Sequence, residues 1–197
     1  MKQPKTVDSK VIDFYKNAYS FVEKNFNEDI TWAKNLEFSK FQPEDFLYEY
    51  VWVVLCSGFS VKGARSIFNK WRENISDLTP ITHPLKRRAI GYMLKNYEDV
   101  YNEIVSKKTN EEKLEYLTTL DHIGDVTKYH LAKNLGMDVA KPDVHLMRIV
   151  DHFGFLSVKQ LCELIKKNTG NSIPLIDTVL WRYCQQNPNY KKEFKLK

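Results

Sequence analysis

The chain has 197 residues, a formal net charge of +5 and a hydrophobic content of 43%. This length suits one domain or two small lobes, and the hydrophobic residues suffice for a sizeable core. With only seven glycines and seven prolines, the composition excludes collagen-like and low-complexity classes. The positive charge fits a polyanionic partner but does not identify one.

The sequence predicts an intracellular, cytoplasmic monomer without a membrane segment. Its longest apolar stretch, residues 50–56, is far too short to span a bilayer, and no apolar signal segment follows the first residues. The three cysteines, Cys56, Cys162 and Cys184, are odd in number and widely spaced, so we expect free thiols in a reducing compartment. No CxxC pair or Cys/His cluster has the spacing of metal ligands, and no metal site is predicted.

Hydrophobic residues recur at helical spacing along nearly the whole chain, and no segment of useful length alternates like a strand. The fold class predicted is all-α. A first helix begins after Asp8 or Ser9, and a helix start at Pro43 leads into the buried helix 46–56. Residues 57–60 break that helix. Further helices are expected over about 61–71, from 84 to 101, near 114–120, and over 125–135, 143–153, 157–167 and 174–184, with a polar loop at 107–112 and a helix end at Gly136.

The most informative segment begins with a tight connection between two helices, in residues 117–136 (LTTLDHIGDVTKYHLAKNLG). Gly124 supplies backbone freedom at the turn. Exposed amides at the start of the second helix favour an anion, for which a DNA phosphate is a natural candidate. Thr127 adds a hydroxyl donor, and Lys128 adds a cation for the same strand.

The second informative element is the sequence Lys141-Pro142-Asp143-Val144-His145. Pro142 ends the preceding loop, and Asp143 stands where a helix N-cap is expected. A capping carboxylate is ionised and rigidly held. It is therefore suited to an electrostatic role.

These two elements together resemble the helix-hairpin-helix DNA glycosylase superfamily, which includes endonuclease III and the adenine-mismatch, alkylpurine and oxoguanine glycosylases. The resemblance rests on residues 120–124 (LDHIG) as the hairpin and residues 142–145 (PDVH) as the catalytic turn. About nineteen residues separate Gly124 from Asp143, close to the family's usual interval. The clear match covers residues 114–150.

The resemblance implies two helical lobes with a central cleft. The first lobe spans about residues 42–136 and contains the hairpin, 117–136. The second is formed by both chain ends, about residues 1–41 and 137–197. The family binds double-stranded DNA, bends it and swings the target nucleotide into a pocket. The carboxylate of Asp143 then stabilises positive charge on the sugar while water attacks, and no cofactor is needed.

Three departures from the family pattern refine this interpretation. Bifunctional members carry a nucleophilic lysine where this chain has Val126, and Lys128 lies roughly 200° further around the helix. A monofunctional glycosylase that leaves an abasic site is therefore predicted. His122 replaces the hairpin's first glycine, which implies either a less tight hairpin or a direct contact of His122 with DNA. Only Cys162 and Cys184 follow the catalytic helix, so no iron-sulfur cluster is expected.

Other residues are open to two interpretations. Phe59 is either a wedge for the gap left by the flipped base or a core residue. Lys62 and Arg65, with Lys70 and Arg72 nearby, could hold phosphates, whereas residues 86–88 more simply form a solvated face. Tyr48, Trp52, Tyr50 and Trp32 are candidates for base stacking, although most aromatic stripes are core.

A last group of polar residues is assigned from helical position alone. Glu49 could read a base edge but is expected to be an exposed helix carboxylate. His145 lines the pocket or orients Asp143, and metal binding with His152 lacks further ligands. Asp177 and Trp181 could brace the lobes.

The function predicted is base excision from duplex DNA. The first alternative is a non-catalytic hairpin module that binds DNA, and the second is a bifunctional glycosylase with lyase activity that uses another lysine. The excised base stays open among alkylated purines, mismatched adenine, thymine or uracil, and oxidised guanine.

Overall fold

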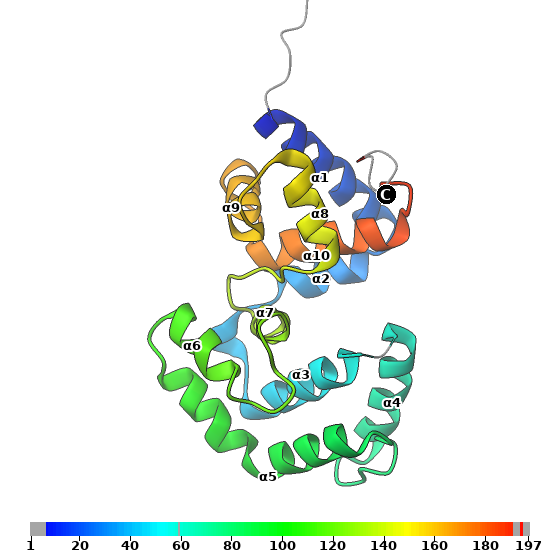
Figure 1. Cartoon of the computed structure of the whole chain (residues 1–197), viewed down its shortest axis with the longest axis vertical. Coiled ribbons are helices and arrows are strands. Elements are labelled where there is room, and N and C mark those ends of the chain that lie inside the picture. The colour runs from blue at the N-terminus through cyan, green and yellow to red at the C-terminus, as the bar shows by residue number, and fades with distance from the viewer. Residues whose placement is uncertain (1–6, 59, 191–193, 195–197) are drawn as a thin grey trace, which may run out of the picture. The chain divides into compact units, whose positions relative to one another are not determined.

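A computed structural model describes residues 7–58, 60–190 and 194. Within these residues all regular structure is helical (Figure 1), which confirms the all-α prediction. The helices are α1 (Val7–Asn25), α2 (Asn27–Lys34), α3 (Pro43–Cys56), α4 (Val61–Glu73), α5 (Pro84–Ser106), α6 (Asn110–Leu117), α7 (Thr127–Asn134), α8 (Val144–Phe153), α9 (Val158–Thr169) and α10 (Ile173–Gln186), with a 3-10 helix at Phe38–Lys40.

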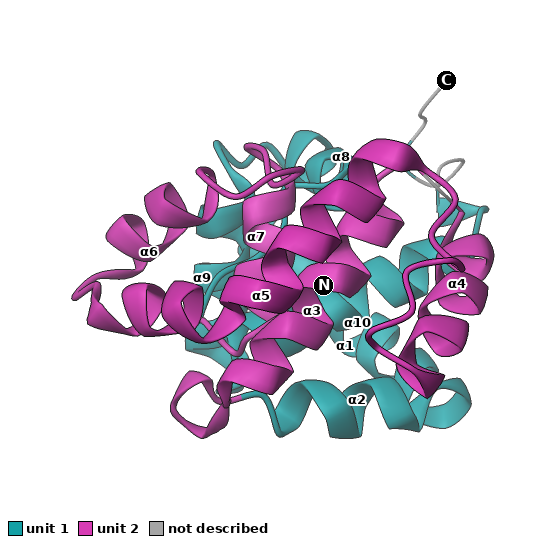
Figure 2. Cartoon of the chain, turned by 90° about the horizontal axis from the view of Figure 1, so that it is seen from below, with its two compact units in different colours: residues 1–36, 138–197 teal, residues 37–137 magenta. Residues whose placement is uncertain are grey.

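The chain divides into two compact units, coloured separately in Figure 2. Unit 1 combines residues 1–36 with residues 138–197, so it is built from both ends of the chain. Unit 2 is the continuous segment 37–137. The hairpin residues belong to unit 2, and Asp143 belongs to unit 1.

Helix α10 forms the centre of unit 1. It packs against α1, α2, α8 and α9, and every residue from Ile173 to Leu180 is buried. A helix that is apolar on nearly all sides is stable only when other helices surround it. Arg182 extends this packing, because its Nε lies 2.5 Å from Oδ2 of Asp29 on α2. The result is a rigid frame for the segment that leads into α8.

Helix α3 forms the centre of unit 2, where it packs against α4, α5 and α7. Gln42 and Asp45 form a capping box at its start. At its end, the buried Lys86 of α5 donates from Nζ to the carbonyl oxygens of Leu55, at 3.3 Å, and of Ser57. A cation there complements the negative end of the helix dipole, while burial lowers the pKa of Lys86. The expectation of a solvated face is therefore wrong for Lys86.

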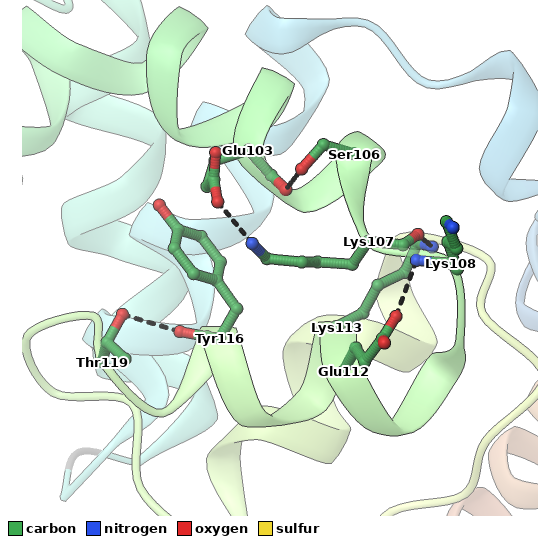
Figure 3. Close-up of polar contacts among 8 residues, drawn as sticks. All are labelled: Glu103, Ser106, Lys107, Lys108, Glu112, Lys113, Tyr116 and Thr119. Atoms are coloured by element: carbon green, nitrogen blue, oxygen red, sulfur yellow. Dashed lines mark hydrogen bonds and ion pairs between the residues drawn. The ribbon is translucent and has the colours of Figure 1, made fainter.

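The segment 107–112 is not the loop that its polarity predicts, because α6 already begins at Asn110. Thr109 and Glu112 form a capping box: Thr109 Oγ1 accepts from the Glu112 amide at 3.1 Å, and Glu112 Oε2 accepts from the Thr109 amide at 3.0 Å. Glu112 also accepts from the Lys108 amide at 2.8 Å (Figure 3). The sequence Thr109-Asn110-Glu111-Glu112 is a helix start that the loop prediction overlooked.

Glycine ends α7 where the sequence predicts it. Gly136 has φ +78°, and a Cβ there would approach the backbone of residues 37 and 38 to within 2.7 Å. The amide of Met137 donates to the carbonyl of Ala132 at 3.0 Å, which is the bond of a Schellman motif. A side chain at position 136 would therefore force the two ends of unit 2 apart.

Glu49 is not the exposed carboxylate expected from helical position. It is part-buried between α3 and α7, and its Oε2 accepts from Nδ2 of the buried Asn134 at 2.8 Å. Burial raises the pKa of Glu49 to about 7, against the opposing effects of Asn134 and Lys133. The protein therefore holds this proton more tightly when folded than when unfolded.

A glutamine at position 49 should remove a pH-dependent loss of stability. Because the folded-state pKa is raised from 4.5 to about 7, the free energy of unfolding falls as pH rises through that window. Glu49→Gln resembles the protonated acid and keeps an oxygen for Asn134. We expect it to match the wild type near pH 4 and to exceed it at pH 8, by no more than about 3 kcal/mol, in urea unfolding. Asp99→Asn, at an exposed site on α5, should lack this gain; an equal gain would contradict the assignment.

Candidate functional site

The connection between α6 and α7 is a tight hairpin in unit 2. The Leu120 amide donates to the carbonyl of Leu117 at 3.2 Å, and the Ile123 amide donates to Leu120 at 3.0 Å. Leu117 and Ile123 are buried. Tyr50 Oη donates to the carbonyl of Asp121 at 2.8 Å, so the buried Tyr50 holds the hairpin on α3. This assigns Tyr50 to the core rather than to base stacking.

His122 adopts a left-handed backbone conformation with φ +64°, and among the described non-glycine residues no other has a positive φ. This conformation costs an ordinary L-residue roughly 1–2 kcal/mol. It occurs at the position where the resembled family has the hairpin's first glycine. The ring of His122 lies edge-on to that of His83, with centroids 6.5 Å apart.

Gly124 is exposed, and a Cβ placed on it would meet nothing within 4 Å. Its φ is not positive, so the turn does not demand glycine for conformational reasons. The Gly124 amide donates to Thr127 Oγ1 at 2.7 Å, which means that the Thr127 hydroxyl is engaged inside the hairpin. The open surface around Gly124 leaves the backbone accessible to a ligand.

Helix α7 begins at the exposed end of the hairpin. The first amide–carbonyl bond of the helix runs from the Lys128 amide to the carbonyl of Gly124, at 2.9 Å. The amides that precede this bond are the first of the helix, and such amides lack intrahelical partners. Lys128 Nζ lies 3.2 Å from Oδ1 of Asp125. Val126 is 44% exposed at the N-cap, so an apolar side chain lies at this surface position.

Asp143 caps α8, as the sequence predicts. Its Oδ1 accepts from the amides of His145 at 2.8 Å and Leu146 at 3.0 Å. Within the described part of the chain, no hydrogen bond or ion pair engages Oδ2. The side chain is part-buried, and Val144 beside it is exposed. One oxygen therefore fixes the carboxylate, and the other is available to a ligand.

The side chain of His145 turns to the C-terminal part of unit 1. Its Nδ1 lies 2.7 Å from Oη of the buried Tyr190, which also accepts from Arg148 Nη1 at 3.2 Å. Cys184 is buried close by. The pKa of the Cys184 thiol is raised to about 12, first by burial and secondly by the negative charge of Asp143. Asp143 therefore has a neutral thiol as its neighbour.

The segment before Asp143 is held by side chains that sequence reasoning did not assign to the site. The Lys141 amide donates to Oδ2 of the buried Asp177 at 2.7 Å, and Asp138 Oδ1 accepts from the Ile173 amide at 3.1 Å. This bond of Asp177 lies within unit 1. Because its partner is 36 positions away, no local pattern could have revealed the bond.

The aromatic candidates Tyr48 and Trp52 lie on α3 in unit 2, where they pack against side chains of α4. Trp52 packs edge-on against Phe68, with centroids 5.6 Å apart, and Arg65 lies 6.0 Å from the Trp52 ring. Tyr48 contacts the buried Trp71 at 5.7 Å. Both Tyr48 and Trp52 are partly exposed, and Lys62 is exposed. Phe59 lies outside the described residues, and Trp32, on α2, belongs to unit 1.

Other kinds of site find little support in residues 7–58, 60–190 and 194. In this part of the chain, no group of three or more His, Cys, Asp or Glu side chains could hold a metal ion. No described helix combines the length and apolar character that crossing a membrane requires. Within these residues, no disulfide joins Cys56, Cys162 or Cys184. His152 stacks on Phe194 with ring centroids 3.9 Å apart.

Comparison with known proteins relates the fold to one enzyme. No family model and no curated protein matches the sequence. Among solved structures, the chain is similar to the 8-oxoguanine DNA glycosylase of Thermotoga maritima, with a TM-score of 0.65 and 16% sequence identity over 88% of this chain and 95% of that one. The chain therefore has the all-helical fold of this glycosylase.

The conformation of His122 predicts an unusual order of stability among substitutions. His122→Gly should exceed His122→Ala in free energy of unfolding by about 1 kcal/mol, because only glycine adopts a positive φ without strain. Asp121, one position earlier, does not have a positive φ, so Asp121→Ala should be at least as stable as Asp121→Gly. Thermal and urea unfolding of the four variants measure both orders. Ala above Gly at position 122 would show that the hairpin relaxes to another backbone conformation.

Proposed function

We propose that this protein is a DNA glycosylase that hydrolyses the N-glycosidic bond of a damaged or mispaired base in duplex DNA. The observation that carries the proposal is the carboxylate of Asp143. It is fixed through Oδ1 by two helix amides, and its Oδ2 is not engaged within the described residues. The glycosylase fold supports the same conclusion.

The proposed chemistry is electrostatic. As the base leaves, positive charge develops on the deoxyribose, and a preorganised carboxylate stabilises that charge without reorienting. The two amide bonds hold the Asp143 carboxylate in one orientation. Oδ2 then faces the sugar and orients the attacking water. For this to occur, the target nucleotide must leave the base stack.

The hairpin is proposed to hold the DNA backbone. The backbone amides that precede the Lys128 amide at the start of α7 offer hydrogen-bond donors, the nearby Lys128 offers a positive charge, and the exposed Gly124 has no side chain to block a ligand. Such groups bind phosphate and position the duplex without reading its sequence. Lys62 and Arg65 of α4 supply further phosphate contacts.

The reaction is proposed to stop at the abasic site. A lyase needs an amine that attacks the sugar, and position 126 holds valine. Lys128 is paired with Asp125 and lies roughly 200° around the helix from that position. We propose 8-oxoguanine as the first base to test, because the similar solved structure is an 8-oxoguanine DNA glycosylase. Alkylated purines and mismatched adenine, thymine and uracil complete the panel.

Replacing Asp143 by asparagine should separate catalysis from binding. Asparagine is as good an N-cap as aspartate, so Asp143→Asn should stay within about 1 kcal/mol of the wild type in stability. Single-turnover release of the base should fall at least about 100-fold, with DNA affinity retained. The readout is alkali cleavage of abasic sites in duplexes that each carry one lesion.

Asp151→Asn, at an exposed site on the same helix, provides the matched control and should release base at the wild-type rate. Equal release by wild type and Asp143→Asn would defeat the proposal. Binding of DNA without release from any duplex would instead favour the non-catalytic hairpin module.

Borohydride trapping tests the monofunctional reaction. We expect no covalent protein–DNA adduct with a lesion duplex, because no lysine amine stands at position 126. The substitution Val126→Lys, which places an amine there, serves as the comparison. A wild-type adduct that Lys128→Ala abolishes would show that the protein is a bifunctional glycosylase.

A further inference from the structure

We infer that Asp177 is a positioning residue for Asp143: its buried carboxylate fixes the backbone that leads into α8 and thereby sets the direction of the Asp143 carboxylate. The catalytic meaning of this inference rests on the proposed function. The anchoring itself rests only on contacts within unit 1, where α8 packs against α10.

The first contact is the bond from the Lys141 amide to Asp177 Oδ2, at 2.7 Å. Asp177 is 2% exposed, and a buried carboxylate is costly unless it accepts hydrogen bonds. A bond to an ionised acceptor is also stronger than a bond between neutral groups. Because the donor is a backbone amide two residues before Asp143, this bond constrains the path of the main chain.

Lys141 is also held through its carbonyl oxygen. The Asp143 amide donates to the carbonyl of Lys141 at 2.8 Å, so both backbone polar groups of Lys141 are engaged. Pro142 between them has a fixed φ and disfavours a helical conformation at Lys141. The three residues before α8 therefore have little freedom once Asp177 is in place.

A second contact fixes the start of the segment 138–143. Asp138 Oδ1 accepts from the Ile173 amide at 3.1 Å, at the start of α10 where Ser172 makes no side-chain cap. Asp138 also pairs with Lys166 of α9. Both ends of the segment are thus attached to α10, one by the exposed Asp138 and one by the buried Asp177.

The surroundings of Asp177 show that it is not a generic core residue. It lies within the run Ile173–Leu180, in which every residue is buried. The adjacent Cys162 has a raised pKa, chiefly through burial and further through Asp177, so its neutral thiol brings no positive charge to the carboxylate. An apolar side chain in this stripe could not make the bond by which Asp177 holds the Lys141 amide.

Asp177→Ala and Asp177→Asn test the inference together, because asparagine keeps an acceptor oxygen. Misplacement of a catalytic group by about 1 Å can reduce a rate about 100-fold. Asp177→Ala should therefore lower single-turnover base release about 100-fold with an unchanged DNA Kd, and Asp177→Asn should restore most of the rate. Hydrogen exchange should show faster exchange of amides 141–147 in Asp177→Ala but not in Asp177→Asn.

Thr178→Val is the matched control. Thr178 is the buried neighbour of Asp177, and its Oγ1 has no hydrogen-bond partner among the described residues. This variant should change neither the rate nor the exchange of amides 141–147. Should Asp177→Ala fail to fold, Asp138→Ala at the exposed anchor should still speed exchange in the segment and slow base release.

Four outcomes overturn the inference or its basis. Wild-type release by Asp177→Ala, or unchanged exchange in the segment, would refute the positioning role. Equal effects of Thr178→Val and Asp177→Ala would reduce Asp177 to ordinary core packing. If the wild type releases no base from any duplex, the proposed function fails, and the exchange pattern alone then decides whether Asp177 anchors the segment.

Discussion

One carboxylate oxygen of Asp143 caps helix α8, and the proposed chemistry depends on the other oxygen, which no hydrogen bond or ion pair engages within the described residues. Because Oδ1 of Asp143 accepts from two backbone amides, the helix itself orients the group. We propose that the same bonds serve both capping and catalysis, since they remove the rotational freedom that an unbound carboxylate would have to lose as charge develops on the sugar.

The environment of Asp143 comes from distant parts of the chain. Tyr190 reaches the His145 ring, and Asp177 holds the Lys141 amide. Helix α10, buried along most of its length, carries Asp177 and receives the cap from Asp138. Unit 2 has a comparable arrangement around α3, where Tyr50 holds the hairpin and Lys86 caps the helix end. In both units a central helix fixes the loop that carries the candidate function.

Local signals predicted most of the helices and the cap. Pro43, Gly136 and Asp143 act within a few residues of their own position, so their effects can be read from the sequence. Helix α2 was missed because only Ile30 and Ala33 of its eight residues are buried, which is too short a stripe for periodicity. The sequence predicts a loop at the start of α6 because the residues of a capping box are polar. The partners of Glu49, His145 and Lys141 were not predictable, since each lies at least 36 positions away.

The interrupted course of unit 1 affects how the chain folds. Helices α1 and α2 end by Lys34, whereas α10, against which both pack, begins only at Ile173. Unit 2 is continuous and can close on itself from neighbouring contacts, but unit 1 requires the joining of segments far apart along the chain. Such joining is slow because a large loop must close first. During synthesis the apolar stripe of α1 therefore lacks its partner until α10 has been made. Unit 1, which bears Asp143, is consequently the last part to assemble.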